Sequence, residues 1–97
     1  MIALAEVPRF RPDWRVHPGE TLREVLRERG ISQARLARTM GYSQKHVNQV
    51  VQGHVAITTE MALRLEEQLR INAEFWLRYQ MMYDLHEARE RHREEKA

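Results

Sequence analysis

Apolar residues recur along the chain at the spacing of amphipathic helices, and short polar or glycine-containing turns separate these stretches. Pro18 suits the first turn of the first stretch, and Gly30 suits a left-handed C-terminal cap after it. A serine, threonine or asparagine precedes each of the other four stretches and suits the N-cap position. The pattern predicts an all-α fold of five helices over residues 18–29, 33–40, 44–52, 59–69 and from 73 to at least 85.

The second and third predicted helices are close enough in the chain to form a helix-turn-helix unit. Ala37 is small where two helices would cross closely, and Gly41 can adopt the positive φ that a tight turn needs. Val47 and Val50 lie at the spacing of an inner stripe on the helix that follows. An ordinary helical hairpin with a solvated outer face is the alternative, but such a face generally carries Glu and Lys four residues apart.

The outer positions of this unit carry amide and basic side chains. No Asp or Glu occurs from Arg29 to Thr59, whereas the other parts of the chain hold all 14 acids. Amides match base edges, lysine supplies a cation for guanine or phosphate, and helix N-termini suit phosphate oxygens. The expected DNA-binding residues are Gln33, Arg38, Ser43, Gln44, Lys45, His46, Asn48 and Gln49, among which Gln44, Lys45, Asn48 and Gln49 would contact base edges and Ser43 and Gln33 phosphates.

The last predicted helix carries more apolar side chains than one buried face requires. Eight of the eleven residues 75–85 are apolar or aromatic, whereas one helix face takes about three to four in seven. Some of these residues belong to the core of the chain itself, but 97 residues cannot easily surround the whole helix. We therefore predict a homodimer or partner interface formed by Trp76, Tyr79, Met82 and Tyr83.

Composition limits the kinds of site that the chain can form. It has no cysteine, so it forms no disulfide or thiolate metal site, which suits a reducing cytosol. The five opening apolar residues are too few for a signal peptide or a membrane span, so we expect a cytoplasmic protein without a membrane partner. His86 and Glu87 begin like a zinc-protease motif, but the next histidine is His92, on a different helix face. We expect no metal, no other cofactor and no enzymatic activity.

The two ends of the chain differ in composition from the middle. Three prolines favour an extended segment before the first helix. The arginines Arg9, Arg11 and Arg15 of that segment either surround Trp14 with charge or contact DNA. The end of the chain mixes both signs of charge, which favours a solvated helix. The expected organisation is an N-terminal arm over residues 1–17, a helix-turn-helix domain over 18–85 and a charged helical tail over 86–97.

Four segments together resemble the HigA-type antitoxins of the Xre helix-turn-helix family: "HPGETLREVL", "SQARLARTMGYSQKHVNQVVQG", "ITTEMALRLEEQL" and "FWLRYQMMYDL". The first and last segments distinguish HigA from other Xre-type repressors. The resemblance covers about residues 17–85 and implies a lambda-repressor-like fold. It also implies a homodimer that binds double-stranded operator DNA, represses its own operon and neutralises a HigB toxin, which is a ribosome-dependent messenger-RNA endonuclease of the RelE type.

Two other functions remain open at this point. One is a stand-alone phage or plasmid repressor of the Xre type, without a toxin. The other is the regulatory module of a metallopeptidase, because "RFRPDWRV" resembles larger relatives that carry a metallopeptidase domain after the same module. If a toxin is bound, we expect its surface to lie on the last helix or the charged tail, away from the DNA-binding residues.

Overall fold

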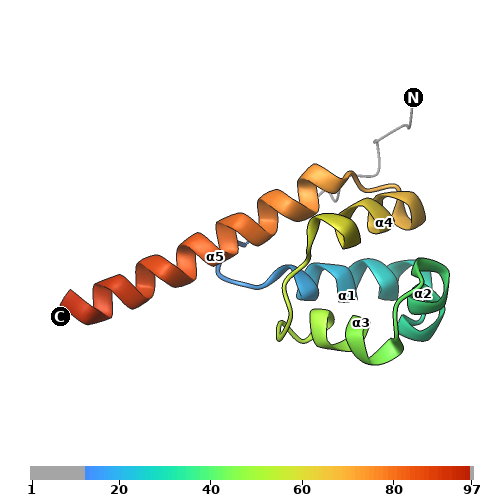
Figure 1. Ribbon diagram of the computed structural model, residues 1–97, viewed down its shortest axis with the longest axis horizontal. Coiled ribbons are helices and arrows are strands. Elements are labelled where there is room, and N and C mark those ends of the chain that lie inside the picture. The colour runs from blue at the N-terminus through green and yellow to red at the C-terminus, as the bar shows by residue number, and fades with distance from the viewer. Residues whose placement is uncertain (1–12, 97) are drawn as a thin grey trace.

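The computed structural model describes residues 13–96 and confirms the all-α, five-helix architecture (Figure 1). The starts of all five helices and the ends of the first four agree with the sequence prediction to within one residue. The charged segment after residue 85 continues the last helix to Lys96. The helices are α1 (Pro18–Arg29), α2 (Gln33–Met40), α3 (Gln44–Val51), α4 (Thr59–Leu69) and α5 (Ala73–Lys96).

Local caps explain where the helices begin and end. The side chains of Ser32, Ser43 and Thr58 each accept a hydrogen bond from the backbone N–H three residues further on. Asn72 Oδ1 does the same at the start of α5, at 2.9 Å. Gly41 ends α2 with a φ of 79°, which a residue without a Cβ adopts without strain. These caps are short-range, which is why the sequence alone predicts the boundaries well.

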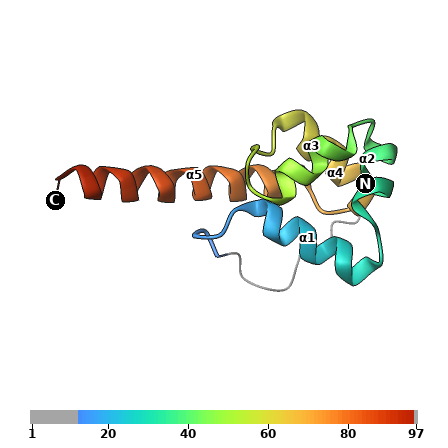
Figure 2. The ribbon, with the colours of Figure 1, turned by 90° about the horizontal axis from the view of Figure 1, so that it is seen from below.

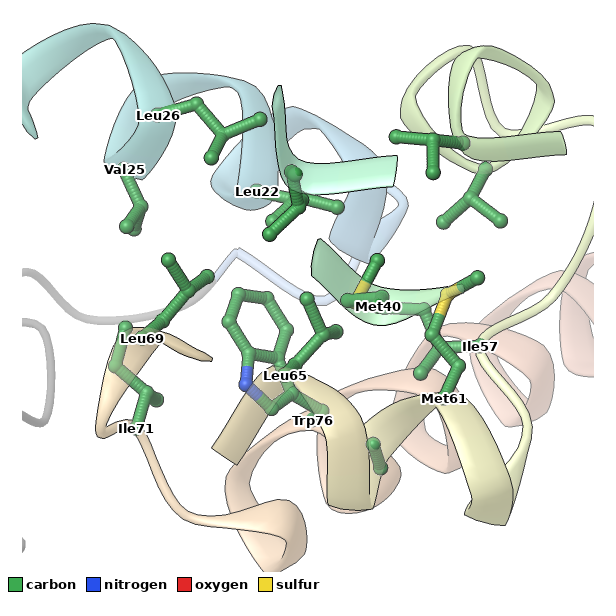
Figure 3. Packing of buried hydrophobic residues seen from close by; sticks show 14 of the residues in the cluster. Leu22, Val25, Leu26, Met40, Ile57, Met61, Leu65, Leu69, Ile71 and Trp76 are labelled. Carbon is green, nitrogen blue, oxygen red and sulfur yellow. The ribbon is translucent and has the colours of Figure 1, made fainter. Parts of the chain in front are cut away.

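One apolar core joins all five helices. Figure 3 shows the indole of Trp76 from α5 among side chains of α1 and α4, including Leu22 and Leu65, and all three residues are fully buried. α3 contributes Val47, Val50 and Val51 to the same core. Three valines fill the inner face of α3, and its other side chains are half-buried or exposed.

The two halves of α5 have different surroundings. The first half packs on α4 and α1, and the second half extends away from the other four helices (Figures 1 and 2). Trp76 (0% exposed) and Tyr79 (2% exposed) lie in the first half, inside the core. The prediction that these two residues form a partner interface is therefore wrong, because other parts of the same chain already cover them.

The segment before α1 explains the burial of Tyr79. The Trp14 ring packs edge-on against the Tyr79 ring, with centroids 5.0 Å apart, and the Tyr79 hydroxyl donates to the Asp13 carbonyl at 3.2 Å. Burial raises the pKa of the Tyr79 hydroxyl, which stays protonated at neutral pH. Arg15 pairs with the Asp13 carboxylate at 3.0 Å and lowers its pKa. Arg9 and Arg11 of the predicted arm lie outside the described residues.

Candidate nucleic-acid interface

α2 and α3 form the predicted helix-turn-helix unit. The Tyr42 N–H donates to the carbonyl of Ala37 at 3.0 Å, which closes the turn after Gly41. Ala37 is buried between helices, as its small size suggested. The turn and the buried valines of α3 together fix how α3 is held against α2.

The N-cap and first turns of α3 carry most of the predicted DNA-binding side chains. Ser43, Gln44 and Lys45 are exposed, and His46 and Gln49 are half-buried. No acid lies in the first turn of either α2 or α3. The surface therefore combines amide hydrogen-bonding groups with positive charge, and neither α2 nor α3 carries an acid, which suits base edges and phosphates.

Ser43 has a structural role that limits what its hydroxyl can do. Its Oγ accepts a hydrogen bond from the His46 N–H at 3.0 Å and so caps α3. The first N–H groups of a helix have no partner within the helix, and they lie at its positive end. A phosphate at this end would be bound mainly by the backbone N–H groups that Ser43 orders.

Gln33 and Asn48 are joined to each other. The Asn48 side-chain amide donates to Gln33 Oε1 at 3.1 Å, across 15 residues of sequence. This bond ties the first residue of α2 to the middle of α3. Among the described residues, the Gln33 NH₂ group and the Asn48 side-chain oxygen Oδ1 make no other hydrogen bond, so both can bind a ligand. Sequence reasoning predicted both residues but missed their contact, which depends on the angle between two helices.

Basic side chains flank this amide surface on α2. Arg35 and Arg38 are both exposed. Arg38 lies in the last turn of α2, just before the loop that leads to α3. Their long side chains can reach a phosphate backbone without fixing its sequence, so Arg38 suits a positioning contact.

The C-terminal end of α3 is packed against the start of α1. His17 precedes α1 as its N-cap residue, and its ring lies so close to Gly53 that a Cβ at residue 53 would come within 2.5 Å of it. A Cβ at Gly19 would overlap the backbone carbonyls of Val50 and Val51. Residues 19 and 53 therefore need to be glycine where α1 meets the end of α3, and the His17 ring packs against the second of them.

Arg64 of α4 is a residue of this region that sequence reasoning missed. Its guanidinium lies 5.5 Å from the centre of the Tyr42 ring. The Tyr42 ring also stacks on the His46 ring of α3, with centroids 5.1 Å apart. No pattern within α2 and α3 points to a partner on α4.

A metal site or a membrane span would each require particular side chains within residues 13–96. No three His, Cys, Asp or Glu side chains of this part of the chain are grouped closely enough to hold a metal ion. None of its helices is both long and apolar enough to cross a membrane. The candidate functional site is the amide and basic surface of α2 and α3 described above.

Known proteins share both the sequence pattern and the fold. The pattern of the helix-turn-helix family (HTH_3) matches residues 22–76. Virulence-associated protein I of Dichelobacter nodosus is 39% identical over 71 residues, which cover 72% of this chain and 66% of that protein. This chain therefore spans just under two thirds of the length of that relative.

Two further proteins are similar to this chain and are antitoxins by name. Antitoxin HigA-1 of Vibrio cholerae is 37% identical over 81 residues, which cover 82% of this chain and 76% of that protein. The structure of Pseudomonas aeruginosa antitoxin HigA with the higBA promoter has a TM-score of 0.72 and 42% identity, and the match covers 80% of this chain and 83% of that one. The chain belongs to the helix-turn-helix family and, within it, to the HigA-type antitoxins.

Proposed function

We propose that this chain is a cytoplasmic, operator-binding antitoxin that represses its own operon and neutralises a HigB-type ribonuclease toxin of the RelE class. The observation that carries the proposal is the exposed, acid-free surface at the start of α3, where Gln44 and Lys45 project from a helix fixed by buried valines. The similar HigA of Pseudomonas aeruginosa, whose structure includes promoter DNA, supports binding to DNA.

On this proposal α3 enters the major groove of double-stranded DNA. Gln44, Lys45 and Gln49 contact base edges, and Asn48 does so while it holds Gln33. The start of α3 and the α2 arginines bind phosphates on either side. His46 lies beside the same surface, stacked on Tyr42. The phosphate contacts fix register, and the amides supply sequence preference.

A second copy of the chain is the partner that fits the outer half of α5. An open groove runs along one side of this helix, and two of its apolar side chains are exposed, Met81 (53%) and Leu85 (39%). Met82 and Tyr83, which were also predicted as interface residues, are half-buried and do not line this groove, so an interface role for them stays a prediction. The groove is lined by Ile57, Leu77, Gln80, Met81, Asp84, Leu85, Ala88 and Arg91.

Charge complementarity supports pairing of this groove with itself. Asp84 and Arg91 lie seven residues apart on the same face, with the small Ala88 between them. A two-fold axis near Ala88 would set two antiparallel α5 helices together, each Asp84 facing the partner's Arg91. The two α3 helices of such a dimer would be expected about one DNA turn apart, roughly 34 Å, on a pseudo-palindromic operator.

Selection from a random-sequence duplex pool tests the DNA-binding part of the proposal. The wild-type chain is expected to enrich a pseudo-palindrome that also occurs upstream of its own gene. Failure to enrich any sequence would contradict operator binding. Co-expression with a HigB-type toxin encoded beside the gene tests the other part, because the chain is expected to restore growth. If no such toxin exists and the chain binds only DNA, it is a stand-alone repressor.

A further inference from the structure

Arg64 holds the turn of the helix-turn-helix unit from outside that unit. Its Nη1 donates to the carbonyl of Met40, the last residue of α2. Carbonyls at a helix C-terminus lack partners within the helix, so this bond satisfies one of them. The same Nη1 lies 3.1 Å from the position that a Cβ at Gly41 would occupy, so the guanidinium lies directly against the turn.

The same guanidinium also contacts Tyr42, which lies in the turn between α2 and α3. It lies 5.5 Å from the centre of the Tyr42 ring, a distance suited to a cation–π contact. Glu60, one turn earlier on α4, accepts from Arg64 Nε at 3.2 Å and orients the side chain. Arginine fits this role because its planar group can donate in two directions while its face lies on a ring.

Tyr42 in turn contacts α3 through His46. The rings of Tyr42 and His46 are stacked with an interplanar angle of 23°. His46 lies in the first turn of α3, next to Lys45, and its backbone N–H is held by the Ser43 cap. A continuous set of contacts therefore runs from Glu60 on α4 to the DNA-facing turn of α3.

We propose that Arg64 is a positioning residue that fixes the α2–α3 turn and, through Tyr42 and His46, sets the angle at which α3 presents its amides to DNA. The inference rests on the proposed DNA-binding function. The valines of α3 hold its inner face but leave its first turn to be fixed from the turn side. Base recognition requires side chains placed to within about 0.5 Å, so a small rotation of this turn weakens it.

A direct contact between Arg64 and a phosphate is the competing explanation, because the side chain is 43% exposed. The two roles differ in salt dependence. Loss of a phosphate contact lowers the slope of log K against log salt by about 1 and weakens every DNA sequence. Loss of a positioning residue leaves the slope unchanged and weakens only the recognised sequence.

The test compares Arg64→Gln, Arg64→Lys and Tyr42→Leu with the wild type and with a matched control, Arg78→Gln, which removes an exposed charge on α5. The probes are a duplex selected by the wild-type chain from a random pool and a scrambled duplex of the same composition. Thermal unfolding of each variant verifies that it is folded at the assay temperature.

We expect Arg64→Gln to bind the selected duplex about tenfold more weakly, which corresponds to about 1.4 kcal/mol, with unchanged affinity for the scrambled duplex and unchanged salt slope. Arg64→Lys should stay weak, because it keeps the charge without the planar contacts. Tyr42→Leu should show the same loss, and the double variant no additional loss, because both changes break one set of contacts. Tyr42→Leu tests the proposal independently if Arg64→Gln fails to fold.

Three results would overturn the inference. Equal weakening on both duplexes with a shallower salt slope would show that Arg64 contacts a phosphate. Full affinity in the folded Arg64→Gln and Tyr42→Leu variants would remove any role for this contact. Additive losses in the double variant would show that the two residues act separately. A wild-type chain that selects no sequence would contradict the proposed function itself.

Discussion

α3 and the outer half of α5 both project side chains away from the core, but they differ in almost every other respect. α3 is eight residues long, its inner face is buried, and both of its ends pack on other elements. α5 is 24 residues long, and its second half extends alone beyond the bundle (Figure 1). α3 shows amides and one sign of charge, whereas outer α5 shows both signs beside an apolar groove.

The difference matches two kinds of partner. DNA presents a rigid, uniformly negative backbone with base edges at fixed positions, so a short, firmly held helix without acids suits it. Protein interfaces combine an apolar centre with a charged rim of both signs. On the proposed function, the molecule therefore separates a DNA-binding surface on α2 and α3 from a protein-binding surface on α5.

Trp76→Ala is expected to have the largest effect on stability. The indole is fully buried at the centre of the core, so its removal should lower the free energy of unfolding by about 3–5 kcal/mol. Chemical denaturation measures this change. A loss below about 1 kcal/mol together with loss of self-association would show that Trp76 is an interface residue after all, and would remove the distinction between the two halves of α5.

Leu85→Asp is expected to disrupt the α5 surface and to leave the α2–α3 surface folded. A carboxylate in the α5 groove should weaken self-association by at least about 2 kcal/mol, as for a central interface residue. Sedimentation velocity at micromolar concentration reports the change. Leu63→Asp is the matched control, because Leu63 is an exposed leucine on α4 that does not line the groove. A dimer that survives Leu85→Asp would place the interface elsewhere.

Gln49→Ala is expected to cost about 1–3 kcal/mol on the selected operator duplex and to relax preference at particular base pairs. The loss should be confined to that duplex, because Gln49 carries no charge. Binding titrations on the selected and scrambled duplexes measure both quantities. Equal losses on the two duplexes would argue against base readout by this residue.

Arg38→Ala is expected to have the smallest and least selective effect. A phosphate contact contributes to every sequence, so affinity should fall similarly on both duplexes and the salt slope should decrease by about 1. Titrations at several salt concentrations show the slope. A loss seen only on the operator would mean that Arg38 reads a base instead.

Much of the fold followed from short-range features of the sequence. The caps at Ser32, Ser43, Thr58 and Asn72 depend on neighbours within three residues, and the helix boundaries that they predict are confirmed. The prediction for α5 failed at Trp76 because periodicity shows that a face is apolar but not which part of the chain covers it.

The candidate site was predictable in its residue types and not in its internal contacts. The lack of acids from Arg29 to Thr59 pointed to α2 and α3 as the surface for an anionic partner, and the structure brings these two helices together. The bond between Gln33 and Asn48 and the contact of Arg64 with the turn depend on how helices cross. Sequence spacing carries little information about such crossings.

The double variant Gln44→Ala/Lys45→Ala tests the separation of the two surfaces most directly. Both side chains are exposed at the start of α3, so the fold should keep its stability to within about 0.5 kcal/mol. Operator binding and rescue of cells that express the neighbouring toxin are measured on the same variant. We expect loss of operator binding with full rescue. A folded variant that retains operator binding, or that fails to rescue, would contradict it.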